Sequence, residues 1–124
     1  IAVPQYEKAV LKSRAVGALP RVTALETAQK EYKMATGHYT GDLSVLSIDT
    51  GIWSCNRTQT SNQGFCQHFP APGIGWEMTF DPDYISYSIY CIGTTDAGRA
   101  VCKEYGTASD TPGRENYFRV RHVR

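Results

Sequence analysis

Four cysteines are the residues of this chain whose type and spacing carry the clearest chemistry. Cys55 and Cys66 are separated by ten residues, and so are Cys91 and Cys102. An even number of cysteines in so short a chain is typical of a disulfide framework formed outside the cytoplasm, and neither the cysteines nor the histidines have zinc-ligand spacing. Of the three possible connectivities we predict Cys55–Cys66 with Cys91–Cys102, because both loops are short and join segments expected to be neighbours.

The other residues that could do chemistry do not form a catalytic pattern. His38, His68 and His122 occur without a nucleophile motif, a glycine-rich phosphate loop or metal-ligand spacing, so we interpret them as satisfied surface groups. Asp81 and Asp83 flank a proline and could in principle serve as an acid–base pair or a calcium site, but turn formation explains the same residues. We therefore expect no enzyme, no cofactor, no metal and no small-molecule substrate.

Length and charge indicate one small domain without a strong overall field. The chain has 124 residues, 41% of them hydrophobic, which allows a single core over residues 1–124. Its formal net charge is only +1. The charges are nevertheless segregated: residues 1–33 carry six basic and three acidic groups, residues 34–110 three and eight, and residues 111–124 four and one. Two basic segments thus flank an acidic middle.

Residues 1–36 are predicted to be one long helical stem. The segment from Pro4 to Thr36 is rich in helix-forming residues and is followed by Gly37, a typical C-cap. Pro20 lies in its middle and should kink it without ending it. Steps of three and four residues place one stripe against a sheet, comprising Leu11, Ala15, Ala18, Val22, Leu25, Gln29 and Tyr32.

The first turns of this helix present a different face. At 100° per residue, Val3, Tyr6 and Val10 lie a quarter turn or more from the later stripe, so one helix serves two neighbours. In the isolated domain we expect these three side chains to be largely exposed. The chain also opens on apolar residues without an initiator Met, which leads us to expect a processed segment upstream.

The rest of the chain is predicted to be a loop followed by a sheet. Residues 37–75 show no sustained period and are expected to connect helix and sheet, with one short strand near Ile52–Cys55. Residues 76–124 should form the sheet and a C-terminal disulfide region, from strands near Gly75–Phe80, Tyr84–Ile92 and Asn116–Val123 and a short helix within Asp96–Gly106. The expected fold is α+β, with the long N-terminal helix packed on a three- to four-stranded antiparallel sheet and disulfide-closed loops.

Aromatic residues gather in the loop-rich middle of the chain. They either roof the core or form an exposed binding patch, and these alternatives stay open at this point. The residues concerned are Trp53, Phe65, Phe69 and Trp76.

The first 40 residues resemble a known family. The opening IAVPQYEKAV, the following KSRA, and the later AQKEY and TGHYT are similar to type IV pilins and pseudopilins just after the membrane-resident half of their N-terminal helix. The resemblance implies a prepilin that is cleaved behind a charged leader, methylated at its new N-terminus, held in the inner membrane and then extracted into a filament. Beyond residue 40 the likeness is architectural, with Cys91 and Cys102 in the place of the family's C-terminal disulfide loop.

The resemblance implies a structural subunit of a bacterial type IV pilus, acting in adhesion, motility or DNA uptake. Val3, Tyr6 and Val10 would form the face of the helix used in filament assembly. The expected partners are copies of the chain, other pilins, the inner-membrane assembly machinery and a surface ligand or DNA. The protein would reside in the inner membrane and periplasm before assembly and at the cell surface afterwards.

Two alternatives belong to the same family. The first is a type II secretion pseudopilin, which we favour less because the calcium-binding C-terminal loop common in major pseudopilins has no counterpart in this sequence. The second is a DNA-binding minor pilin that would contact phosphate through a basic surface of Arg114, Arg119, Arg121 and Arg124. For Arg119 and Arg121 we expect instead one solvated face of a terminal strand.

Overall fold

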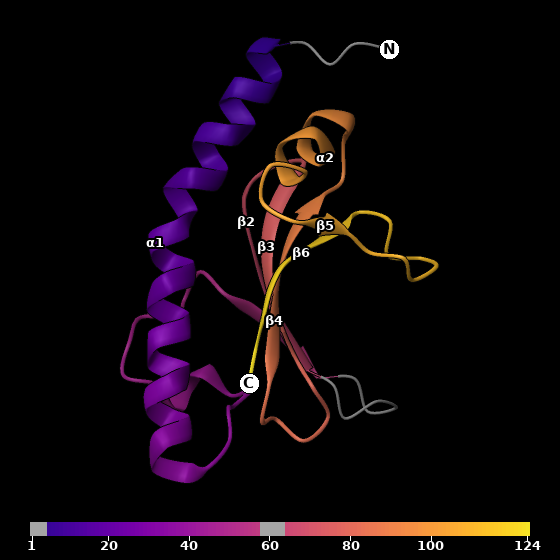
Figure 1. The fold of residues 1–124 in the computed structure, drawn as a ribbon. Coiled ribbons are helices and arrows are strands. Elements are labelled where there is room, and N and C mark those ends of the chain that lie inside the picture. The colour runs from indigo at the N-terminus through magenta and orange to yellow at the C-terminus, as the bar shows by residue number, and fades with distance from the viewer. Residues whose placement is uncertain (1–4, 58–63) are drawn as a thin grey trace.

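The computed structural model describes residues 5–57 and 64–124, and its largest element is a single long helix (Figure 1). Helix α1 (Gln5–Thr36) runs unbroken through Pro20. Figure 1 shows its N-terminal half inclined to its C-terminal half, in agreement with a bend at the proline. Gly37 ends the helix with a φ of 91°, and its N–H donates to Lys33 O at 2.7 Å, as expected of a C-cap.

The sheet has six antiparallel strands, two or three more than the sequence predicted. Their spatial order is β1-β2-β3-β4-β6-β5. The strands are β1 (Ser54–Arg57), β2 (Gly64–Ala71), β3 (Ile74–Phe80), β4 (Tyr87–Gly93), β5 (Thr107–Ala108) and β6 (Tyr117–Val123). A 3-10 turn η1 (Leu43–Val45) follows the long helix, and the short helix α2 (Asp96–Cys102) follows β4 within the predicted range.

The prediction of a connecting loop over residues 37–75 is wrong in its second half. The short strand lies at Ser54–Arg57, two residues beyond the predicted place, and β2 was missed altogether. The sequence of β2, GFCQHFPA, contains Gly, Gln, His and Pro and does not alternate cleanly. It is a strand because β1 and β3 pair with it on both sides, and such pairing overrides a weak local preference.

The core lies between α1 and one face of the sheet, which we call the inner face (Figure 1). The predicted helix stripe is confirmed from Leu11 to Gln29, whereas Tyr32 at its end is only half buried. Trp76 Nε1 donates to Ala15 O at 3.2 Å and so joins sheet to helix. The largest fully buried side chains of the core include Trp76, Tyr39, Tyr87, Phe80, Leu25, Ile74, Met78 and Ile89.

Gln29, the one polar member of the stripe, is satisfied. Its amide nitrogen donates to Thr40 O at 2.7 Å, and its amide oxygen accepts from Thr40 N at 3.0 Å. These two bonds hold the backbone of Thr40 against the helix, four residues after the helix ends. A buried amide with both functions bonded carries little desolvation cost, which explains its place in an apolar stripe.

The last strand contains an irregularity that changes the expected placement of its arginines. Arg121 is paired with Ile89, whereas Arg119 is paired with Tyr90, so β6 carries one extra residue, Val120, at this point. Ile89 and Tyr90 point to opposite faces of the sheet. The prediction that Arg119 and Arg121 share one solvated face is therefore wrong: Arg121 lies on the inner face and Arg119 on the outer face.

Candidate functional site

The first turns of α1 expose apolar side chains, as the change of face predicted. Tyr6 is 83% exposed and Val10 is 38% exposed. Val3, the third member of the expected face, lies outside the described residues. Figure 1 shows this end of the helix beside α2 at the upper end of the molecule.

The opposite side of the same turns is tied to the domain by charge. Lys12 Nζ lies 2.8 Å and Lys8 Nζ 3.4 Å from the Glu104 carboxylate. The hydrogen bond from Lys12 lowers the pKa of Glu104, and the same bond raises the pKa of Lys12. Lys12 and Glu104 are exposed and Lys8 is partly exposed, so these pairs orient the helix more than they stabilise it.

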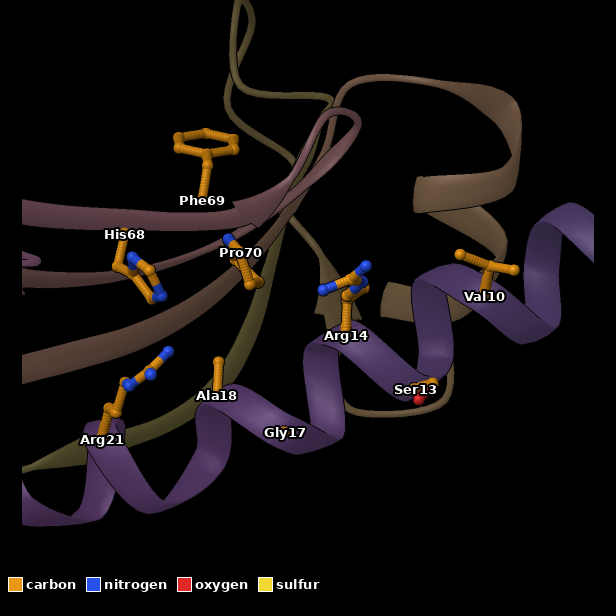
Figure 2. Close-up of a pocket in the computed structure, with 9 residues that line it drawn as sticks. All are labelled: Val10, Ser13, Arg14, Gly17, Ala18, Arg21, His68, Phe69 and Pro70. Atoms are coloured by element: carbon orange, nitrogen blue, oxygen red, sulfur yellow. The ribbon is translucent and has the colours of Figure 1, made fainter.

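A groove runs between the N-terminal half of α1 and strand β2 (Figure 2). Its cavity volume is about 600 Å³. Arg21 reaches from the helix toward His68, and Arg14 rises from the helix toward the strand, while Phe69 points away from the helix. The full lining is Val10, Ser13, Arg14, Gly17, Ala18, Arg21, His68, Phe69 and Pro70.

The charges in this groove are all of one sign. Within residues 5–57 and 64–124, neither Arg14 nor Arg21 forms a salt bridge, and no acidic side chain lines the groove. Burial and the nearby Arg21 guanidinium lower the pKa of His68, which keeps its imidazole neutral at pH 7. The arrangement is a concave surface with two permanent cations and no counter-charge from the part of the chain that the structure describes.

His68 differs from the satisfied surface histidine that was predicted. It lies in β2, half buried, with its ring 5.9 Å from that of Trp53. Its Nε2 atom is buried and has no hydrogen-bond partner in the described part of the chain. The sequence offered no signal for this, because β2 itself was not predicted.

The aromatic residues of the middle segment divide between the two alternatives. Trp53 and Trp76 belong to the core, 9% and 1% exposed. Phe69 is 43% exposed and covers Gly75, where a Cβ would meet its ring at 2.6 Å. Phe65 is half buried, so the group is mainly core, with one exposed ring beside the groove.

Both predicted disulfides are present. Cys55 and Cys66 face each other across β1 and β2 with their Cα atoms 4.0 Å apart, and Cys91 on β4 is bonded to Cys102 at the end of α2 with a Cα separation of 5.4 Å. The second bond is fully buried, whereas Cys55 of the first is exposed. The first bond links β1 to β2 and the second links β4 to α2, so both have a structural role.

The predicted basic surface is largely neutralised. Arg114 pairs with Glu77 at 3.2 Å, and Arg121 pairs with Glu26. Arg119 donates to Ser88 Oγ at 2.8 Å. Arg124, the last of the four, is exposed at the end of the chain. The four arginines thus lie on different faces and do not form one surface.

Two buried carboxylates were missed by sequence reasoning. Glu26 is 6% exposed and Glu77 is 2% exposed. Glu26 is next to Leu25 at the margin of the helix stripe, a position that could have suggested burial. Glu77 lies on the outer face of β3, where it accepts bonds from Gln67, Thr79 and Arg114.

The other two histidines lie beside polar groups. His38 Nδ1 lies 3.0 Å from Tyr39 O, and His122 Nε2 lies 3.4 Å from Asp81 Oδ2. Over the ranges that the structure describes, no three His, Cys, Asp or Glu side chains are grouped so that they could hold a metal ion. Over the same ranges, none of the helices combines the length and the apolar character needed to cross a bilayer.

Comparison with known proteins returns no match, either to a family model, to a curated protein or to a solved structure.

Proposed function

We propose that this protein is a structural subunit of a type IV pilus or a closely related filament, assembled through the exposed face at the start of α1. The observation that carries the proposal is the two-sided helix. From Leu11 onward α1 buries one stripe under the sheet, whereas Tyr6 and Val10 leave apolar surface uncovered on another side. Val16 and Met34 are also exposed apolar residues of α1, but Tyr6 and Val10 are four residues apart and so lie on one face of its first turns. A helix that packs on its own domain along one stripe and offers an apolar face beside it suits bundling with copies of itself.

The oxidised domain supports the same proposal. The disulfide between Cys91 and Cys102 closes the segment that a pilin would use for its C-terminal loop, and it favours a pilus over a secretion pseudopilus as the setting. The DNA-binding alternative has less support, because Arg114 and Arg121 are engaged with Glu77 and Glu26.

The test uses the full-length gene in its own cells and one pair of matched substitutions. Val10→Lys places a charge on the proposed assembly face, and Val16→Lys places it on an equally accessible part of the same helix, about 120° around the axis. In the isolated domain both changes should alter the free energy of unfolding by no more than about 0.5 kcal/mol. On cells, Val10→Lys should greatly reduce the number of filaments, and Val16→Lys should affect it less.

Two results would count against the proposal. The proposal would be wrong if cells that express the unmodified gene form no filaments containing this protein. Equal filament numbers for Val10→Lys and the unmodified protein would show that the early face has no partner.

A further inference from the structure

We propose that the groove between α1 and β2 receives the acidic turn at Asp81 and Asp83 of a second copy of this chain, so that copies stack head to tail. This inference rests on the proposed filament function, and it names the contact between folded domains that accompanies bundling of the helices. The groove supplies the positive half of the contact and the turn between β3 and β4 supplies the negative half.

The two arginines of the groove are arranged as a pair. They are seven residues apart on α1, which places them on one side of the helix about 10 Å apart along its axis. Between them Gly17 leaves the floor open, since a Cβ added there would meet no atom within 4 Å. Figure 2 shows both side chains rising from the helix on the side that faces β2. A segment lying along this floor would have one guanidinium near each end.

Among the described residues, the groove has no anionic partner. Its lining residues include no carboxylate, and the described side chains offer Arg14 and Arg21 no ion pair. An anionic segment from outside would supply the counter-charge that these two arginines lack.

The turn between β3 and β4 has the matching chemistry. Asp81 and Asp83 are the only two carboxylates of the chain within three residues of each other, so their Cα atoms lie no more than about 7 Å apart. The Asp83 side chain is exposed and accepts from Ile85 N at 3.2 Å through Oδ1. The Asp81 side chain is 40% exposed and lies 3.4 Å from His122, and Arg124 borders the same hollow without a salt bridge to either carboxylate among the described residues. The chain is held in this turn by bonds from Tyr84 N to Asp81 O at 2.9 Å and from Asp81 N to Ser86 O at 3.1 Å.

Such a turn is ordered before it binds, which lowers the entropic cost of docking. Two carboxylates on a fixed turn can then meet two guanidinium groups as charge-assisted pairs.

The groove and the turn lie at different levels along α1. The N–H of Tyr39, just after the C-terminus of α1, donates to Tyr84 O at 2.7 Å, which fixes the turn at that end. The groove is built on the N-terminal half of α1. In Figure 1 the turn is at the bottom and the N-terminal half of α1 is at the top. Complementary patches at two different levels of the molecule produce a heterologous contact that can repeat without closing, as a filament requires.

The experiment is a charge exchange in the full-length protein on cells. The groove variant is Arg14→Glu with Arg21→Glu, and the turn variant is Asp81→Lys with Asp83→Lys. Each should lower filament number by about tenfold or more, because it opposes like charges across the contact. The variant that combines all four changes restores opposite charges and should recover most of the filaments. Melting of each soluble domain must show that all three variants fold.

The control variant for the groove is Lys30→Glu with Lys103→Glu. It changes the net charge as much as the groove variant does, at exposed sites outside the groove, and should leave filament number unchanged.

Three outcomes would overturn this inference. If the groove variant assembles normally while Val10→Lys does not, this inference is overturned and the proposed function stands. If both separate variants fail and the combined variant does not recover, the turn is not the partner of the groove. If filaments stay intact but the groove variant loses a salt-sensitive affinity for duplex DNA that the unmodified domain has, the groove belongs to nucleic acid.

Discussion

Glu26 of α1 and Arg121 of β6 form an ion pair that joins the long helix to the last strand across the inner face of the sheet. Both Nε and Nη2 of Arg121 donate to the carboxylate, the first at 3.1 Å from Oε2. Tyr87 Oη donates to the same Oε2 at 2.6 Å. A buried carboxylate is thereby bonded by two elements that are far apart in sequence. The ion pair depends on the bulge at Val120, because the bulge places the Arg121 side chain on the inner face.

Arg121→Gln should therefore destabilise the domain by about 1–3 kcal/mol, because it leaves the Glu26 carboxylate buried with one partner fewer. Arg119→Gln is the matched control: the same change two residues earlier removes only a bond to Ser88 on the outer face and should cost about 0.5 kcal/mol. Chemical denaturation of the two variants measures the difference. Equal losses would mean that the bulge does not separate the roles of the two arginines.

The same carboxylate should contribute to acid sensitivity. Burial opposes ionisation of Glu26, but hydrogen bonds from Arg121 and Tyr87 outweigh it and hold the pKa below its usual value. A carboxylate with a lowered folded pKa contributes stability above its unfolded pKa, and that contribution is lost as the pH falls through the folded value. Comparison of unfolding free energies of the wild type and Glu26→Gln at several pH values between 7 and about 2 is the test. The difference in unfolding free energy between the two proteins should become smaller as the pH falls. A difference that stays constant with pH would contradict the lowered pKa of Glu26.

The two faces of α1 should respond differently to the same truncation. Val22 is 1% exposed and Val16 is 46% exposed on the same helix. Val22→Ala should lower the free energy of unfolding by about 1–3 kcal/mol through lost burial and a small cavity, and Val16→Ala by no more than about 0.5 kcal/mol. Leu25→Ala, at 0% exposure, should cost on the order of 2–5 kcal/mol. Similar melting curves for Val22→Ala and Val16→Ala would show that the stripe is not the core.

The two disulfides should differ in how readily they are reduced. Cys55 is exposed, whereas Cys91 and Cys102 are each 0% exposed, so a mild reductant should reach the first bond before the second. Each bond closes a loop with a sequence separation of 11, and in the chain-entropy model each contributes roughly 3 kcal/mol. Alkylation and peptide mapping during stepwise reduction give the order, and melting of the partly and fully reduced forms gives the stability. Reduction of Cys91–Cys102 first would overturn this ranking.

Much of this protein is determined by local sequence. The stripe from Leu11 to Gln29 has the helical period, so it specified both the helix and its buried face before any partner was known. Gly37 ends the helix for a local conformational reason, its positive φ. The cysteine pairing also followed from short loops, because closing a short loop costs little entropy.

The tertiary structure alone decided the features that depend on contacts between distant segments. Strand β2 exists because β1 and β3 pair with it, although its own residues give a weak strand signal. One extra residue in β6 reversed the face of Arg121, a change that a period of two cannot predict without knowing the register. The groove beside Arg14 and Arg21 likewise required β2 to be placed against α1. Local propensity determines which elements form, but register and packing between distant elements determine which side chains meet.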